Sequence, residues 1–471
     1  MLGKRCRRSA MANGHGLRLP PGPWQLPIIG SLHHMIGKLP HHAMRDPRAA
    51  PWAAHAAPDR RGCPRWWCPP PFARSPTAIG ESSWRPTGHT GGSSAGSPPP
   101  SSSARAAFSP SAPSARRRPP PCCARAPPLR RGSRAVDMRE RLSALITDTT
   151  MRAAMGDRFK DREVFLRALD RIIVLAAGFN MADLWPSSRI VSRLSGAVRH
   201  CEEIRDTTFR ILDGIIEEHL EKMGNRGGGE VEDLLDVLLK VQQDGDLPIP
   251  LDMDVIKLAI LLDIFGGSET TAPTLEWAMA ELVHNPKVME RVTAEVRNAF
   301  AAHGSVREDK LAEAGLRYLP LVILETLRLH TPLPFLIPQA CQEPCRVLGY
   351  DVPQGITVMV NAWALGRDEQ YWPGDPDAFR PERFEAGGGS AADFKGADFE
   401  LLPFGSGRRM CPGMGFALAN MELALASLLF HFDWEVPGAA ELDMTEAFGL
   451  TAHRKSRLLL RPILRVPVPG V

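Results

Sequence analysis

A cysteine near the carboxyl end of the chain is the residue best suited to bind a metal. Cys411 stands directly before an apolar stretch that predicts a helix. The positive end of a helix dipole and its free N–H groups favour a thiolate over a thiol, and a thiolate is a good soft metal ligand. Gly405, Gly407 and Gly413 let the backbone approach a flat partner closely, and Arg409 offers a cation to an anionic group. A lone cysteine is more often a buried apolar residue, but these surroundings favour a cofactor site.

A run of small and polar residues interrupts a second apolar helix at positions 266–271. Gly266 and Gly267 each cost this helix about 1 kcal/mol relative to alanine, so a helix that keeps them uses the room they leave. A threonine such as Thr270 can bond the carbonyl four residues back and bend the helix, which would open a groove beside a cofactor. That bond alone is also the simplest structural interpretation of Thr270.

A charged pair occurs in an otherwise apolar helical segment. Glu325 and Arg328 are three residues apart and therefore share one helix face. An isolated pair of this kind is commonly an exposed ion pair. In so apolar a segment we expect it to be buried, and a buried carboxylate needs charged donors to compensate it.

The elements that position these residues are mostly helices. Apolar residues recur at three- and four-residue spacing from Val136 onward, and short alternating segments bounded by turns follow residue 340. The expected fold class is mainly α with a small β-sheet part. The predicted helices cover residues 138–155, 163–177, 189–223, 231–241, 251–300 with a break at Asn285-Pro286, 311–328 and 413–430, and the predicted strands lie in 345–352 and 357–360.

Composition divides the chain into four parts: a basic tail (1–18), a proline-rich lead-in (19–45), a low-complexity segment (46–134) and a body (135–471). Within 51–134 eighteen of 84 residues are proline, and the branched aliphatic residues are only Ile79 and Leu129. Such a stretch cannot bury enough apolar surface to offset its ordering entropy, so it predicts disorder. Its flanks are well patterned, and we also hypothesise that it is translated out of frame or mis-spliced.

Charge and cysteine content narrow the possible functions. The net charge of the whole chain, +4, gives no reason to expect nucleic-acid binding. The charges are unevenly distributed, because residues 51–134 contain thirteen Arg and only two carboxylates. Nine cysteines in a long chain favour a reducing compartment. No uninterrupted apolar run of membrane-spanning length occurs. A zinc site is a weak hypothesis, because the spacing is unsuitable in the four cysteines Cys63, Cys68, Cys122 and Cys123.

The segment Phe404, Gly407, Arg409, Cys411 and Gly413 resembles the haem-binding loop of the cytochrome P-450 superfamily. The resemblance implies a haem b cofactor, with Cys411 as the axial iron ligand and Arg409 paired with a haem propionate. Three further motifs match in the family's order. By resemblance, Thr270 hydrogen-bonds oxygen at the cofactor and Glu269 relays protons, while Arg383 in Pro381-Glu382-Arg383-Phe384 joins the structural triad Glu325, Arg328 and Arg383.

The resemblance is greatest to plant A-type members and covers residues 19–45 and 136–471. It implies a monooxygenase that inserts one oxygen atom from O2 into an apolar, terpenoid-like specialised metabolite. It also implies an NADPH-dependent flavoprotein reductase as partner, and anchoring on the cytosolic face of the endoplasmic reticulum membrane. The substrate pocket would include Gly266, Ile337 and Phe448.

The chain departs from the family pattern at several points. We expect no apolar anchor before the basic tail and find no early Trp with an Arg four residues on; Gln339 replaces the usual Arg or His near a propionate. The 265–270 motif is one small residue short, which would rotate upstream contacts by about 100° on a helix. The expected fold is therefore a cytochrome P-450 fold incomplete in its N-terminal portion. The alternative function is a non-functional paralogue or defective product that keeps the motifs without holding haem.

Overall fold

The computed structural model describes most of the chain from residue 135 onward and one short piece before it. The described residues are 39–45, 135–156, 159, 161–176, 194–225, 233–245, 251–347, 349–385, 393–394, 398–438, 441–447 and 449–468. The low-complexity segment predicted to be disordered and the basic tail lie outside these ranges. In the described part the protein is mainly helical with small antiparallel sheets, which confirms the expected fold class.

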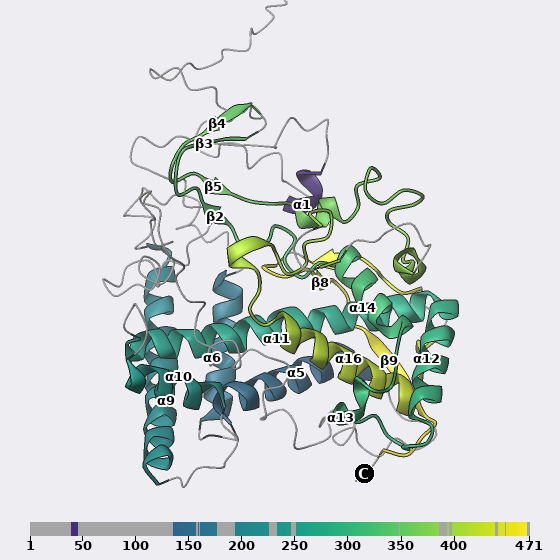
Figure 1. Ribbon diagram of the computed structural model, residues 1–471, viewed down its shortest axis with the longest axis horizontal. Helices are drawn as coiled ribbons and strands as arrows, with labels where there is room; N and C mark the ends of the chain where they lie inside the picture. The colour runs from purple at the N-terminus through teal and green to yellow at the C-terminus, as the bar shows by residue number, and fades with distance from the viewer. Residues whose placement is uncertain are drawn as a thin grey trace, which may run out of the picture.

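One long helix, α11 (Met253–His284), runs through the middle of the molecule (Figure 1). It starts where the side chain of Asp252 accepts a hydrogen bond from the Val255 N–H at 2.8 Å, which satisfies one of the free donors of the first turn. It ends at Asn285, and Pro286 begins the next helix, where its missing N–H costs nothing. The predicted break at Asn285-Pro286 is therefore confirmed.

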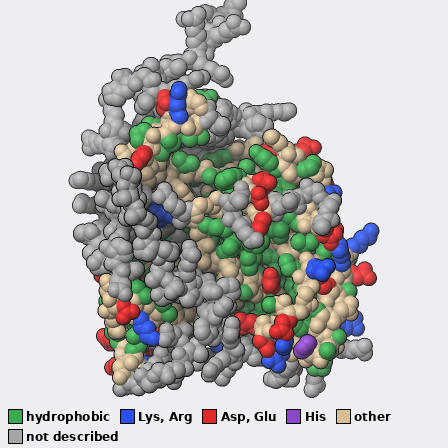
Figure 2. Space-filling model, in the orientation of Figure 1, with side chains coloured by type: hydrophobic (Ala, Val, Ile, Leu, Met, Phe, Trp, Pro, Cys, Tyr) green, Lys and Arg blue, Asp and Glu red, His purple; other side chains and the backbone are tan. Residues whose placement is uncertain are grey.

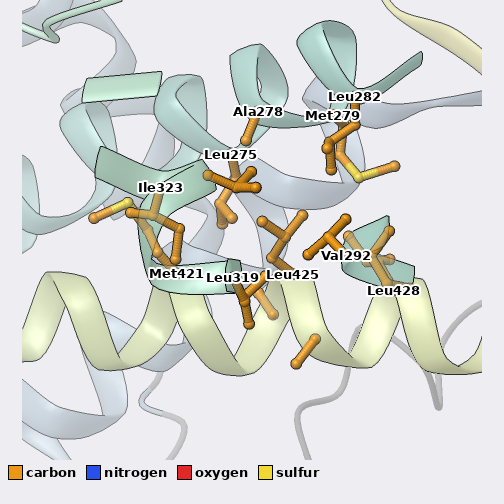
Figure 3. Packing of buried hydrophobic residues seen from close by; sticks show 14 of the residues in the cluster. Leu275, Ala278, Met279, Leu282, Val292, Leu319, Ile323, Met421, Leu425 and Leu428 are labelled. Atoms are coloured by element: carbon orange, nitrogen blue, oxygen red, sulfur yellow. The ribbon is translucent and has the colours of Figure 1, made fainter. Parts of the chain in front are cut away.

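The main hydrophobic core lies where α11 meets four other helices: α5 (Met138–Met155), α12 (Pro286–Phe300), α14 (Tyr318–Leu329) and α16 (Met414–His431). Figure 3 shows Leu275, Leu319 and Leu425 pointing toward one another from three of these helices. All three side chains are almost fully buried. This core supports both helices that carry the predicted site motifs, α11 and α16.

A second core joins the first half of α11 to α6 (Arg162–Ala176), α9 (Ala197–Asn225) and α10 (Leu234–Asp244), which lie together at the left of Figure 1. Phe165, Leu235 and Ile260 are each 0% exposed in it. The glycines at 266 and 267 therefore lie between two separately packed halves of one helix.

The strands are short and antiparallel. A three-stranded sheet has the order β1 (Val136–Asp137), β9 (Leu459–Leu464), β6 (Phe432–Glu435), so the last strand lies between two earlier ones. In its register Val136 pairs with Leu460 and Trp434 with Pro462. Three two-stranded sheets complete the set: β2 (Gln339–Ala340) with β5 (Thr357–Val358), β3 (Cys345–Val347) with β4 (Tyr350–Val352), and β7 (Glu446–Ala447) with β8 (His453–Arg454).

Short helices fill the connections between these elements. They are α1 (Pro40–Ala43), α13 (Glu308–Leu311), α15 (Ala362–Leu365) and two 3₁₀ turns, η3 (Pro381–Phe384) and η4 (Gly407–Arg409). On the face shown in Figure 2, hydrophobic side chains are prominent right of the centre, and charged groups of both signs lie mixed along the right margin.

Two predicted helices were wrong in their extent. The helix expected over 189–223 is interrupted at Gly196, whose φ of 65° is incompatible with a helix passing through it, and α9 begins after this glycine. Residues 189–193 of that prediction lie outside the described residues. The helix expected over 311–328 is divided into α13 and α14, because Gly315 takes a φ of 64° in the turn between them. In both cases apolar periodicity continues across a glycine at which the backbone changes direction.

Within the described residues one helix, α16, is long and apolar enough to cross a membrane by length and composition. Half of its 18-residue window is buried inside the protein, and its second half lies in the main core. Its apolar surface therefore serves packing against α11, α12 and α14.

Candidate functional site

The loop that carries Cys411 is a tight, glycine-dependent turn before α16. The Cys411 N–H donates to the Phe404 carbonyl at 2.9 Å and closes the loop. Gly405 and Gly407 have φ values of 71° and 69°, the left-handed region that favours glycine. A Cβ atom at either position would meet nothing within 4 Å, so the glycines border open space as well as turning the chain.

The thiol of Cys411 has a less favourable electrostatic environment than the sequence suggests. Burial raises its pKa, the Gly413 backbone N–H lowers it, and the charge of Asp263 raises it again. The lowering effect of the helix terminus is thus present at Gly413, but desolvation has the larger effect on the pKa although the residue is exposed at the surface. A bound cation would supply the missing compensation, since metal coordination deprotonates a thiol.

The middle of α11 offers similar room. A Cβ at Gly266 would meet no atom within 4 Å, as at Gly405, Gly407 and Gly413 in the loop. Since Asp263 acts electrostatically on Cys411, this part of α11 and the loop lie close together. A soft sulfur ligand with glycine surfaces on two sides fits a flat iron-porphyrin. Phe404, Gly407, Cys411 and Gly413 would hold it from the loop side.

Thr270 makes the bond expected of a helical threonine. Its Oγ1 donates to the Gly266 carbonyl at 2.7 Å, one turn back and on the face of the open space. Three residues later Pro273 lies inside α11, where it has no N–H to donate to the Glu269 carbonyl. The helix thus has one weakened turn directly beside the predicted site.

Glu269 is a half-buried acid whose pKa lies near neutral pH. Burial raises its pKa to about 7, with a further upward effect from Asp170 and a downward one from Arg139. Glu269 precedes Thr270 by one residue in α11, so the two side chains point about 100° apart around the helix axis. A carboxyl group that exchanges its proton near pH 7 has the property a proton relay requires.

Glu325, Arg328 and Arg383 are brought together in a buried cluster. Arg328 binds Glu325 through two bonds, Nε to Oε2 at 2.7 Å and Nη2 to Oε1 at 2.8 Å, and Arg383 Nε binds Oε1 at 2.9 Å. The side chains are 0%, 0% and 4% exposed for Glu325, Arg328 and Arg383 respectively. The exposed ion pair considered from sequence is therefore not what forms.

The remaining donors of this triad bind backbone. Arg328 donates to the carbonyls of Pro376 at 2.7 Å and Ala378 at 3.2 Å, and also to Gly366. The Glu325 Oε1 accepts a further bond from the Arg380 N–H at 2.8 Å. The triad therefore ties α14 to the loop before η3. Its geometry is that of a structural cluster.

Other residues singled out from sequence lie in different settings. Arg409 ends η4 and is exposed, and Gln339 is exposed in β2, paired with Val358. Ile337 is 53% exposed on the approach to β2. Phe448 and the four cysteines considered for zinc lie outside the described residues.

Sequence reasoning missed a buried polar network around Glu446. Its carboxylate accepts from His41 Nε2 at 2.8 Å, His42 Nε2 at 3.0 Å and Trp363 Nε1 at 3.1 Å. His330, at the end of α14, bonds Glu281 at 2.7 Å and stacks on Trp277 at a centroid distance of 3.9 Å. Asp263 was missed too: burial raises its pKa to about 7. The sequence signal that could have identified Asp263 is its position about one helical turn before Gly266.

Comparison with known proteins places these features in a family. A family model described as cytochrome P450, written here cytochrome P-450, matches residues 128–461. Zealexin A1 synthase from Zea mays is 39% identical over 96% of this chain and 93% of its own length. Dolabradiene monooxygenase from Zea mays is 39% identical, covering 95% and 93%, and premnaspirodiene oxygenase from Hyoscyamus muticus is 37% identical, covering 96% and 94%.

Proposed function

The chain belongs to the cytochrome P-450 family and is a haem-dependent monooxygenase, and we propose that it inserts one oxygen atom from O2 into an apolar, terpenoid-like specialised metabolite. The observation that carries the proposal is that the exposed Cys411 loop lies near a segment of α11 with an open glycine and an acid of raised pKa. That arrangement combines a metal ligand, room for a flat group and a proton source in one region.

We propose haem b as the form of the cofactor, held by the Cys411 sulfur. When bound, the haem iron supplies activation of O2, with the thiolate increasing electron density at the metal. Gly405, Gly407 and Gly413 leave room on the loop side, and Arg409 provides a cation for a carboxylate of the group. Gly266 leaves the corresponding room on α11.

The chain's own residues would then manage protons and orientation. The Thr270 hydroxyl, now bonded to Gly266, can turn to donate toward the open space, since a helical threonine alternates between such rotamers. Glu269, with a pKa of about 7, can take a proton from the α5 and α6 side and pass it on. Mobility of this turn is favoured by Gly266, Gly267 and Pro273.

An apolar substrate agrees with the residues assigned to the pocket. Ile337 presents an exposed branched side chain, and Gly266 adds open volume. Two similar proteins carry the names dolabradiene monooxygenase and premnaspirodiene oxygenase, and both names denote oxidation of a diene. A terpenoid-like hydrocarbon is the substrate class that we propose, with Phe448 as a further pocket residue.

An electron donor is needed because the reaction consumes two electrons for each O2. We propose an NADPH-dependent flavoprotein reductase as this partner, and the cytosolic face of the endoplasmic reticulum membrane as the location. Membrane association and location rest on family resemblance alone.

The alternative, a non-functional product, is not supported by the comparisons, which align 96% of the chain with named enzymes. The first test is the carbon-monoxide difference spectrum of the reduced, expressed protein beside Cys411→Ala. We expect a strongly red-shifted Soret band in the first and its loss in the second. Soluble, folded protein without any haem signal would overturn the proposal.

A further inference from the structure

Two cysteines outside the haem-thiolate region lie within reach of each other. The Sγ atoms of Cys341 and Cys345 are 3.7 Å apart, and both thiols are free. Cys345 is exposed and Cys341 partly so, in contrast to Cys201, which is 6% exposed. Two accessible thiols at this separation can form a disulfide after the sulfurs move about 1.7 Å closer.

The backbone positions the pair at the junction of two small sheets. The Cys341 N–H donates to the Ile356 carbonyl at 2.8 Å, and its carbonyl accepts from Gly355 at 2.7 Å, so Cys341 extends the β2–β5 ladder. Cys345 is the first residue of β3 and pairs with Val352 of β4. The thiol of Cys341 also donates to the Glu343 carbonyl at 2.9 Å, which turns it inward toward the connecting loop.

We propose that Cys341 and Cys345 are a reversible disulfide site, oxidised by small disulfides such as oxidised glutathione, that links the β2–β5 ladder to the β3–β4 hairpin. Ile337, a proposed pocket residue, lies two positions before β2. The bridge would therefore restrain the strand that leads directly from the pocket. This site is separate from Cys411 and takes no part in oxygen insertion.

The chemistry balances through two exchange steps. The thiolate of Cys345, the more exposed sulfur, attacks the disulfide of oxidised glutathione; one glutathione leaves as a thiolate and a mixed disulfide remains. The Cys341 thiol then loses its proton and attacks the Cys345 sulfur, and the second glutathione leaves. The protein loses two electrons and two protons, and oxidised glutathione becomes two molecules of glutathione. Burial and the hydrogen bond with Cys345 raise the pKa of Cys341, consistent with its acting second.

Mass spectrometry can test this directly. Cleavage after Arg328 and Arg346 gives the peptide 329–346, in which Cys341 and Cys345 are the only cysteines. The full chain is equilibrated in reduced or oxidised glutathione, denatured with iodoacetamide present, and digested. We expect two labels on this peptide after reduction. After oxidation we expect loss of both labels with a mass lower by two hydrogen atoms, and full relabelling after a reductant is added.

Matched variants separate pairing from general oxidation. In Cys341→Ser and in Cys345→Ser the remaining thiol can form only a glutathione adduct, while Cys201 in the same sample reports the reactivity of a buried cysteine. Circular dichroism melts confirm that each variant folds. Hydrogen exchange across residues 339–358 should be slower in the oxidised wild type and unchanged in the variants. The proposal is overturned if oxidised glutathione leaves both labels on the wild-type peptide, or gives separate adducts without a bridge.

Discussion

A wholly buried carboxylate must have its charge compensated, and Glu325 achieves this through two arginines and a backbone N–H. The cluster remains charged in a dry environment, so the loss of one member leaves the others unpaired. Burial lowers the pKa of Arg383, while the negative charge of Glu325 raises it. The Glu325 carboxylate thus stabilises the buried positive charge of Arg383.

We therefore expect Glu325→Gln to lower the free energy of unfolding by about 3–5 kcal/mol, because two buried guanidinium groups lose their counter-charge. Urea unfolding followed by circular dichroism measures the change. Glu290→Gln on α12, an exposed glutamate, is the matched control and should change stability by less than about 0.5 kcal/mol. Equal effects of the two variants would contradict a compensating role for Glu325.

Glu269 gives a prediction with opposite signs for stability and activity. Its folded-state pKa of about 7 lies above the ordinary value of 4.5, so its contribution to stability falls as pH rises from about 4.5 to 7. Glu269→Gln removes that loss and should be more stable than wild type by about 1–3 kcal/mol at pH 8, with little difference at pH 4. Thermal melts of the haem-free chain across this range measure it.

If Glu269 relays protons, the same variant should form product about tenfold or more slowly with reductase and substrate present. Glu290→Gln again serves as control for both measurements. If Glu269→Gln is more stable at pH 8 but fully active, Glu269 has the raised pKa that we describe but does not relay protons.

At the scale of elements, two adjacent glycines of α11 have different surroundings. A Cβ at Gly267 would lie 2.9 Å from Thr150 Cγ2 on α5, whereas one at Gly266 would meet nothing within 4 Å. The close approach of α5 to α11 therefore depends on Gly267. At Gly266, by contrast, no packing contact requires a glycine.

Gly267→Ala should destabilise the protein by about 1–3 kcal/mol through overpacking. Gly266→Ala should stabilise the haem-free chain by up to about 1 kcal/mol, since alanine is the better helix former. Urea unfolding of both variants in one buffer measures the contrast, and Thr150→Ala should relieve the cost at Gly267 but not alter Gly266→Ala. Equal effects at the two positions would show that the α5 contact is not what distinguishes them.

How far the sequence predicts these elements depends on whether the signal is local. The bounds of α5 are Met138–Met155, as expected, because apolar spacing begins at an Asp cap and ends at Gly156. The helices expected over 189–223 and 311–328 were extended across Gly196 and Gly315, because these glycines turn the backbone without breaking the apolar pattern. The motif around Cys411 could be read from residue types, since its glycines serve a local turn. The Glu446 network could not, because His41 is 405 positions away from its partner.

At the scale of the whole molecule, this network connects segments from both ends of the chain. Glu446 in β7 binds His41 of α1 and Trp363 of α15, and His330 Nδ1 lies 3.9 Å from its Oε1. Burial raises the pKa of Glu446, but its bonds to the histidines and the charge of Arg367 lower it more, so the net shift is downward. Burial lowers the pKa values of His41 and His330 below 6.5.

The pKa shifts of His41, His330 and Glu446 all make the free energy of unfolding smaller as the pH falls. Folded His41 and His330 stay neutral while their unfolded forms gain protons below pH 6.5, and folded Glu446 stays ionised below 4.5, so stability decreases as pH falls. Glu446→Gln should cost about 1.5–3 kcal/mol at pH 7 and progressively less below pH 4.5. Thermal melts from pH 7 to 4 test this, and a pH-independent cost would contradict it.

The position of β9 has a consequence for how the protein is made. Leu459–Leu464 lies between β1 and β6, and the Leu458 carbonyl accepts from Met138 at the start of α5 at 2.9 Å. The ribosome synthesises the chain from its amino end, so β1 and β6 emerge before the strand that joins them. Until Leu459–Leu464 has left the ribosomal tunnel, this sheet cannot close. A nascent chain that stops before residue 459 would leave the tunnel with β1 and β6 unpaired, and quality control would meet two open strand edges rather than a finished sheet.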